Sequence, residues 1–192
     1  MTSNQTASKS RFSTQNLVLA GMFAAVLAVI SQISIPMPSG VPITIQVFGI
    51  ALVGTILGWK LGLFSTIVYI LIGAVGVPVF ANFRGGLEVL TGMSGGYILA
   101  WPVMTALCGI RPPFADRKKS FILSVILSLA GLMIVEFIGA VQWSLLTDSM
   151  SLNAIIIYSF VAFIPKDMVI TVLAVVVGRQ IQKPLKRAGY TK

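Results

Sequence analysis

Long apolar stretches separated by short polar loops are the feature that most constrains this chain. Of its 192 residues, 56% are hydrophobic and only 10% are charged, whereas a soluble domain averages about 25% charged residues. One membrane-spanning helix needs about 20 residues, so about six spans with short loops fit this length. We therefore expect an all-α integral membrane protein, folded as a single bundle of six transmembrane helices.

The alternation of apolar and polar residues predicts where these helices lie. The six apolar segments expected to cross the membrane are 16–30, 43–57, 61–77, 95–110, 120–143 and 152–181. Gly58-Trp59-Lys60 predicts a tight turn between the second and third. Residues 1–15 are polar and predict a disordered cytoplasmic tail, residues 16–182 form the expected membrane domain, and residues 183–192 form a basic cytoplasmic tail.

The last apolar segment is too long for one straight span. About 30 residues cover roughly 45 Å of helix, against a hydrocarbon core of about 30 Å. Pro165 lies inside it, removes a backbone donor and disfavours helix at Ile164. We therefore expect a break near 163–165, with a second helix from Pro165 that places Lys166 and Asp167 in its first turn.

The basic residues predict the orientation. If there are six spans, the termini and the loops after the second and fourth spans share one side, and these carry Lys9, Arg11, Lys60, Arg111, Arg117, Lys118, Lys119, Arg179, Lys183, Lys186, Arg187 and Lys192. The positive-inside rule makes that side cytoplasmic, so both termini are expected inside. The net charge of +9 then meets anionic lipid headgroups of the bilayer, and we expect no nucleic-acid partner.

Residues 78–97 stand out between two apolar segments on the opposite, outer side. They hold five glycines together with Asn82, Arg84 and Glu88. Glycine-rich chain with hydrogen-bonding side chains can fold back over a small polar molecule. The segment therefore predicts a lid over a binding site at the outer membrane surface.

Several polar residues are candidates for that site, each with a structural alternative. Asp167 and Lys166 are charges at membrane depth, where a ligand contact or a local ion pair explains such residues. Arg84 suits a substrate carboxylate, or it pairs with Glu88 four residues on. Asn82 offers both a donor and an acceptor, or it serves as a turn residue.

The remaining polar positions extend this picture. The loop before the second span contains three prolines and predicts a stiff connection, as a short hairpin or a pocket mouth. Gln46, at the start of that span, can point inward. Glu136, with Gln142 nearby, is either a ligand contact or a hydrogen-bonding residue inside the bundle, and we favour the bundle.

Small residues and absences complete the analysis. Ala20, Ala24 and Ala28 form one smooth helix face, suited to internal packing or to docking of another membrane protein. The chain has no histidine and one cysteine, and it lacks a phosphate-binding loop and any catalytic or metal-ligating constellation. We expect neither an enzyme nor a cofactor or metal.

Three motifs, at residues 32–46, 73–81 and 92–97, resemble the BioY family, the biotin-binding S-components of energy-coupling factor (ECF) transporters. The similarity spans residues 16–179. It implies a multi-pass protein of the bacterial plasma membrane that binds biotin with high affinity from outside. It also implies a transmembrane coupling protein and two ATPases as partners, with the alanine face as the docking surface. In the family an acidic residue is followed three positions later by lysine, whereas here that position is Ile170 and Lys166 precedes Asp167.

The resemblance leads to a specific hypothesis for the site. The ureido ring of biotin would bond Asp167 and Asn82, and Arg84 or Lys166 would meet its carboxylate. The apolar ring would pack on aromatic residues such as Tyr97 and Phe80. A stand-alone secondary transporter of biotin or a similar small vitamin is the alternative function, and such a carrier should show paired acids or an internal repeat.

Overall fold

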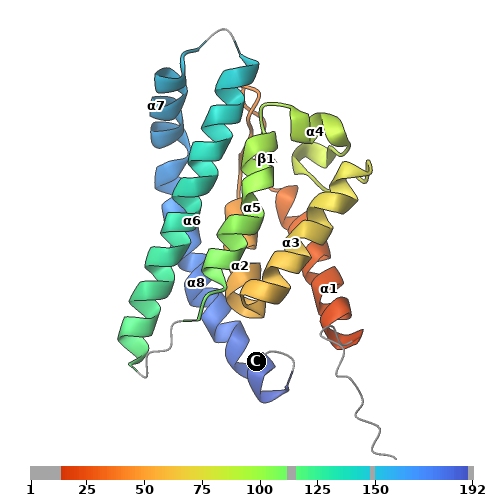
Figure 1. Ribbon diagram of the computed structural model, residues 1–192, viewed down its shortest axis with the longest axis vertical. Helices are drawn as coiled ribbons and strands as arrows, with labels where there is room; N and C mark the ends of the chain where they lie inside the picture. Colours follow the sequence, from red (N-terminus) through yellow and green to blue (C-terminus); the bar gives the residue numbers. More distant parts are fainter. Residues whose placement is uncertain (1–13, 112–115, 148–149, 190–192) are drawn as a thin grey trace, which may run out of the picture.

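The computed structural model describes residues 14–111, 116–147 and 150–189 as a helical bundle with one small hairpin (Figure 1). The elements in chain order are α1 (Thr14–Ser31), β1 (Ser34–Ile35), β2 (Ile43–Thr44), α2 (Gln46–Leu57), α3 (Trp59–Ala74), a 3₁₀ turn (Ala81–Phe83), α4 (Leu87–Thr91), α5 (Gly95–Cys108), α6 (Arg117–Leu146), α7 (Leu152–Ala162) and α8 (Ile164–Arg187).

The six predicted apolar segments correspond to α1, α2, α3, α5, α6 and the α7–α8 pair, with shifted ends. Helix α1 begins at Thr14, and the rest of the predicted N-terminal tail lies outside the described residues. Trp59 and Lys60 belong to α3, so the predicted turn reduces to Gly58, whose φ of 81° suits glycine. Helix α8 continues to Arg187, so the first half of the predicted basic tail is helical.

The predicted break in the last apolar segment is confirmed at Phe163. Helix α7 ends at Ala162 and α8 begins at Ile164, with Pro165 in the first turn. The two helices are bent by 48° relative to each other. Proline is tolerated in a first turn, because the amide it lacks would have no helical partner there. The bend carries the start of α8 toward the centre of the bundle.

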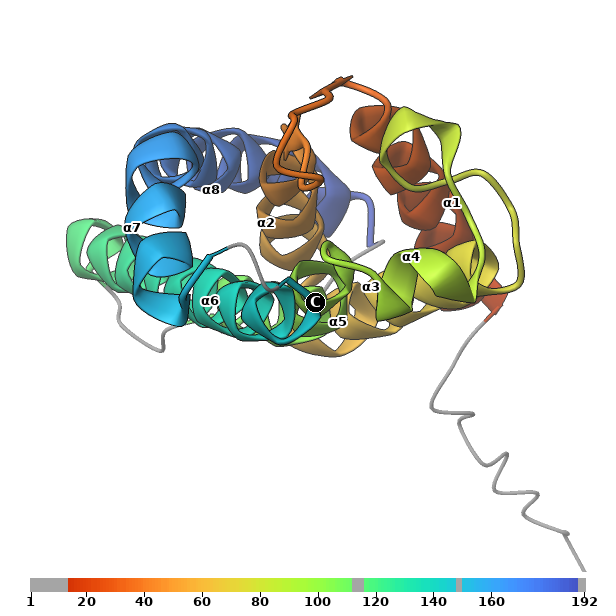
Figure 2. The same ribbon diagram turned by 90° about the horizontal axis from the view of Figure 1, so that it is seen from above.

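Helix length separates the bundle into two classes. Among the described residues, α1 and α6 are each long and apolar enough to cross a membrane, and the bent α7–α8 pair adds a third if it counts as one span. Helices α2, α3 and α5 are apolar but shorter. Helix α2 is buried almost throughout and lies among α1, α3, α5 and α8 (Figure 2). A helix that is apolar on every side is expected in such a central position.

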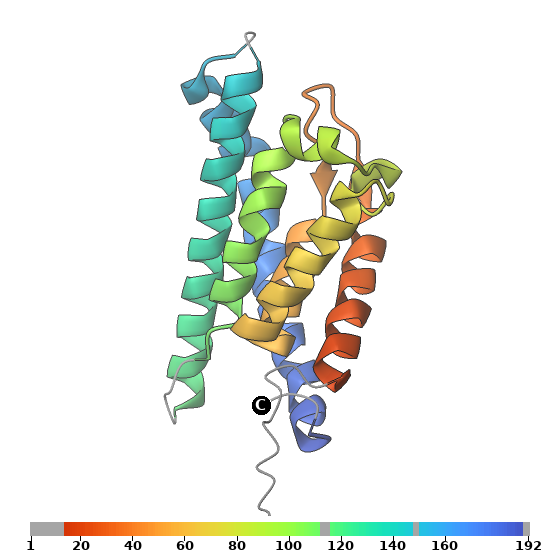
Figure 3. The same cartoon turned by 45° about the vertical axis from the view of Figure 1, so that its right-hand side comes forward.

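The two ends of the bundle differ in character. The start of α1 and the end of α8 lie at one end, whereas the β1–β2 hairpin and α4 lie at the other (Figure 3); we call the second one the hairpin end. Strands β1 and β2 pair antiparallel, which is the short hairpin expected from the proline-containing loop. At the end opposite the hairpin, Arg179 donates to the Ser120 carbonyl over 2.9 Å and ties α8 to α6.

Candidate ligand-binding site

A cavity of about 250 Å³ opens at the hairpin end of the bundle. The hairpin, the start of α2, residues 80–94, α5, α6 and the start of α8 all contribute to its wall. The polar and charged residues that line it are Thr44, Gln46, Asn82, Arg84, Ser94, Tyr97, Glu136, Lys166 and Asp167. Small-molecule sites occupy about 300–1,000 Å³, so this cavity suits a compact ligand.

The cavity gathers every side chain that the sequence proposed as a ligand contact. Those residues are Gln46, Phe80, Asn82, Arg84, Tyr97, Lys166 and Asp167, and each lines the same cavity. They come from α2, the 80–94 segment, α5 and α8, which are far apart in the chain. Their convergence at one place is what a binding site for a small polar molecule requires.

An ion pair at the start of α8 forms part of the wall. The Lys166 ammonium donates to the Asp167 carboxylate, and Asp167 is only 3% exposed. Lys166 also donates to the Thr44 carbonyl over 2.6 Å, which connects α8 to strand β2. The local ion pair that the sequence left open is therefore present. The helical spacing of about 100° per residue suggested that the two side chains diverge, but the long lysine side chain bends back to its neighbour.

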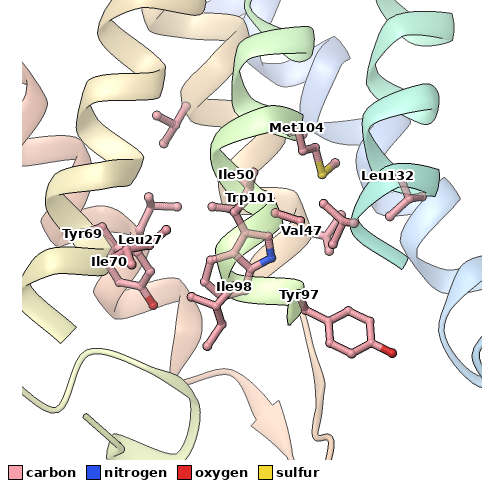
Figure 4. Close-up of a cluster of buried hydrophobic side chains, with 14 of the residues drawn as sticks. Leu27, Val47, Ile50, Tyr69, Ile70, Tyr97, Ile98, Trp101, Met104 and Leu132 are labelled. Carbon is pink, nitrogen blue, oxygen red and sulfur yellow. The ribbon is translucent and has the colours of Figure 1, made fainter. Parts of the chain in front are cut away.

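Aromatic residues surround the apolar part of the cavity. Tyr97, Ile98 and Trp101 of α5 line the cavity together with Val47 of α2, and Figure 4 shows these four side chains. The Tyr97 ring meets Phe163, at the break between α7 and α8, edge to face with centroids 6.3 Å apart. Such pairs fix ring orientation beyond simple burial. The wall is therefore a rigid aromatic surface on which an apolar ring can pack.

Part of the glycine-rich segment 77–94 lines the cavity, and the bundle holds this segment, which we call the cover, at several points. The Tyr69 hydroxyl donates to the Val79 carbonyl over 2.8 Å, and Gln32 donates to the Phe80 carbonyl over 3.1 Å. The Phe80 ring packs on Gly73, where any Cβ would collide with it. This part of the cover is therefore anchored to α1 and α3.

The other end of this covering segment is held by α6. The Gln142 side chain donates to the Leu90 carbonyl over 2.9 Å and to the Gly92 carbonyl over 2.8 Å. These bonds satisfy backbone carbonyls at the end of the short helix α4, which have few hydrogen-bond partners from secondary structure. Gln142 is thus a positioning residue for the cover and does not line the cavity.

Asn82 and Arg84 occupy the inner edge of the cover in different ways. Asn82 has a φ of 58°, a left-handed conformation that asparagine tolerates, and its Oδ1 accepts from the Ser34 hydroxyl over 2.9 Å. It is therefore both a turn residue and a link between cover and hairpin. Arg84 is extended and lies outside α4, so its predicted helical pairing with Glu88 does not form. Lys166–Asp167 is the one ion pair among the described residues.

Gln46 and Glu136 are two further polar residues of the cavity wall. Gln46 lines the cavity and also donates to the Tyr69 hydroxyl over 3.4 Å. Part of its hydrogen-bonding capacity is therefore used within the bundle. Glu136, for which the sequence left a ligand contact or a place inside the bundle open, is buried within the bundle, and it also lines the cavity. A single acid inside an apolar helix was the available signal. The sequence alone did not indicate that Glu136 and Asp167 line the same cavity.

The alanine face expected to dock a partner is mostly interior. Ala20 and Ala24 are 1% and 3% exposed, and the Ser65 hydroxyl of α3 donates to the Ala20 carbonyl over 2.8 Å. Small residues here allow α1 and α3 to approach closely. The structure thus corrects the docking prediction in favour of internal packing, with only Ala28 partly exposed. A partner could reach Ala20 and Ala24 only after α1 moved away from α3.

Comparison with known proteins points to one family. A model described as the BioY family matches residues 3–187. A probable biotin transporter BioY from Pyrococcus horikoshii is 37% identical over 164 residues, covering 85% of this chain and 94% of that protein. The biotin transporter BioY of Thermotoga maritima is 34% identical over 169 residues, with coverages of 88% and 96%.

A solved structure is similar across the whole fold. It is the crystal structure of the S-component for biotin from an ECF-type ABC transporter, and it superposes with a TM-score of 0.76. The two chains are 30% identical, and the match covers 95% of each. Similarity in sequence and in fold therefore extends over the bundle and over the elements that line the cavity.

Proposed function

The chain belongs to the BioY family, and we propose on that basis that it captures biotin as the S-component of an ECF-type transporter. Like its relatives, it is a transport protein, and it is not an enzyme. The observation that carries the proposal is the convergence of hydrogen-bonding, cationic and aromatic side chains on one cavity of ligand size. Biotin has a matching chemistry: a cyclic urea, an apolar ring and a carboxylate.

The proposed placement of biotin follows from the chemistry of the wall. The buried Asp167 carboxylate accepts from a urea N–H, and Asn82, with an amide donor still available, bonds the urea carbonyl. The exposed guanidinium of Arg84 makes no ion pair or hydrogen bond among the described residues, so it is free to bind the valerate carboxylate. The ring system packs on Tyr97, with Phe80 behind the cover. Lys166 is engaged by Asp167 and Thr44 and acts mainly by orienting the acid.

The proposed membrane arrangement places this cavity on the outside. Helices α1, α2, α3, α5, α6 and α7–α8 make six crossings, with the short central helices sheltered by the longer ones. Lys60 lies at the start of α3, Arg111 follows the end of α5, and Arg179 lies in the second half of α8; α3 starts and α5 and α8 finish at the end of the bundle opposite the hairpin, where α1 also starts. The positive-inside rule then puts both termini in the cytoplasm. Biotin enters from outside through the hairpin end.

Uptake against a gradient needs an energy source that this chain lacks. We propose a transmembrane coupling protein and two ATPases as partners, since the similar solved structure comes from an ECF-type ABC transporter. One observation favours the alternative of a stand-alone carrier: two acids, Glu136 and Asp167, line the same cavity. Reconstitution into liposomes separates the two. Biotin accumulation without ATPases would support the carrier, and accumulation only with ATPases and ATP supports the S-component.

Ligand-induced stabilisation tests the proposed substrate directly. A ligand present at 100 times its Kd stabilises the folded state by about 2.7 kcal/mol. The melting temperature of the purified protein should therefore rise by several degrees with biotin and stay unchanged with unrelated vitamins such as thiamine or riboflavin. A rise with one of the others and none with biotin would reject biotin as the substrate.

A further inference from the structure

Glu136 is a buried carboxyl group for which the described protein residues provide no complete set of partners. It lies on α6, it is 6% exposed, and it lines the cavity. Its Oε2 atom is buried and accepts no hydrogen bond within the described part of the chain. Leaving a buried carboxyl oxygen without a donor costs considerable free energy. A side chain in this position needs a partner, and the cavity that it lines is a place where a ligand can supply one.

The neighbouring charges do not supply that partner. The carboxyl of Glu136 interacts electrostatically with Asp167 and with Lys166. It also interacts electrostatically with the Tyr97 hydroxyl of α5. The Lys166 ammonium, however, already donates to Asp167 and to the Thr44 carbonyl. The Tyr97 hydroxyl is engaged with Ser159. The cavity therefore presents two carboxyl groups, and of these the Lys166 ammonium donates a hydrogen bond to Asp167 only.

We propose that Glu136 is a second carboxyl contact for the ligand, accepting a hydrogen bond from a ligand N–H. The inference rests on the proposed capture of biotin, and it gives Glu136 the ligand-contact role that the sequence analysis left open but did not favour. A cyclic urea has two N–H donors, so Asp167 on α8 takes one and Glu136 on α6 takes the other. Two acids also favour a cation, because charge-assisted hydrogen bonds are roughly twice as strong as neutral ones. The site therefore takes a second ligand class, cyclic guanidinium compounds.

The two ligand classes make the role of Glu136 measurable. Biotin carries the neutral urea, and 2-iminobiotin carries a cyclic guanidinium at neutral pH in an otherwise identical molecule. Equilibrium binding of both ligands is measured on the purified full-length protein and on Glu136→Gln, which keeps the shape and removes the ionisable group. Glu136→Leu removes all hydrogen bonding. Glu88→Gln is the matched control, because Glu88 is an exposed acid on α4 that does not line the cavity.

The substitutions at Glu136 are expected to affect the binding of the two ligands to different extents. Glu136→Gln should weaken 2-iminobiotin about tenfold to a hundredfold and biotin clearly less, as expected for loss of a hydrogen bond to a charged group. Glu136→Leu should weaken both ligands about tenfold or more, and Glu88→Gln should change neither. If Glu136→Leu fails to fold, the ratio of the two affinities in Glu136→Gln decides alone, since a purely structural role would shift both ligands by the same factor.

Two results would overturn the inference, and they are distinguishable. If the wild-type protein binds neither ligand, the proposed biotin capture fails and the inference fails with it. If the wild type binds biotin, but Glu136→Gln leaves the ratio of biotin to 2-iminobiotin affinity unchanged, biotin capture stands and only the role of Glu136 is rejected.

Discussion

The Lys166 ammonium of α8 donates to the main-chain carbonyl of Thr44 on strand β2, over 2.6 Å and across 122 positions of sequence. The same ammonium pairs with the buried Asp167 carboxylate. One lysine therefore orients the acid in the cavity and fixes the hairpin that forms the cavity mouth. The break between α7 and α8 makes this possible, because it brings the first turn of α8 under the hairpin.

Replacing this lysine should damage both functions at once. Lys166→Met keeps the apolar stem but leaves Asp167 buried without its cation, and losing one partner of a buried pair is strongly destabilising. Because the Lys166 side chain is 29% exposed, we expect a milder loss of about 1–3 kcal/mol in unfolding free energy, together with weaker biotin binding. Thermal unfolding and equilibrium binding measure the two effects.

Lys60→Met provides the control for that experiment. Lys60 lies at the start of α3 and its ammonium sits 5.1 Å from the centroid of the Trp59 ring, away from the cavity. Its replacement should leave biotin affinity unchanged. If Lys166→Met and Lys60→Met behave alike in both measurements, the connection through Lys166 has no special role.

The contact between Gly73 and Phe80 predicts a steric effect on the cover. A methyl group at Gly73 would occupy the space of the Phe80 ring, so Gly73→Ala should push that ring and its main chain out of place. Overpacking of this kind costs about 1–3 kcal/mol, and we expect a lower melting temperature and weaker biotin binding.

Gly21→Ala is the matched comparison on α1. A Cβ at Gly21 meets nothing within 4 Å, and glycine inside a helix is less favourable than alanine by roughly 0.5–1 kcal/mol. This variant should bind biotin normally and be equally or slightly more stable. Normal biotin binding by Gly73→Ala would show that the cover does not depend on the position of the Phe80 ring.

Gln142 should control how long the ligand stays bound. Gln142→Leu removes both side-chain donors to the carbonyls of Leu90 and Gly92, which frees one end of the cover. We expect biotin to dissociate about tenfold faster, since each such hydrogen bond contributes about 0.5–1.5 kcal/mol. Stopped-flow or filter-binding measurement of the dissociation rate tests this.

Gln182, at the other end of the bundle, provides a control that distinguishes an effect on the dissociation rate of biotin from an effect on protein stability. Gln182 donates to the Thr55 carbonyl over 2.8 Å, far along α8 from the cavity. Gln182→Leu should lower stability by a similar amount and leave the dissociation rate of biotin unchanged. Equal acceleration by both variants would mean that general loosening, rather than release of the cover, governs the ligand's exit.

Hydrophobicity and proline chemistry predicted much of this fold. The apolar runs indicated each long helix, and Pro165 indicated the break at Phe163, because both signals act locally along the chain. The ends of the helices were less predictable. Nothing in the residues around Gly58 specified that one glycine would suffice to connect α2 and α3.

The sequence identified candidate residues of the site but not their arrangement in three dimensions. Asp167 and Arg84 were recognisable because charge is rare in apolar sequence. Glu136 carried the same signal, but its membership of the cavity depends on how α6 faces α8, which is a tertiary relationship. The alanine positions 20 and 24 show the same limit: a face of small residues favours close packing without specifying whether the neighbour is α3 or another protein.

Calorimetric titration of biotin into the purified wild-type protein, Asp167→Asn and Asp167→Ala tests the central claim most directly. Asparagine keeps the size of the side chain but replaces a charged acceptor with a weaker neutral one, so we expect about tenfold or greater loss of affinity, and a larger loss with alanine. Tight binding by the wild type with this graded loss is the predicted result. Wild-type affinity in both variants would contradict the claim that biotin sits in this cavity against Asp167.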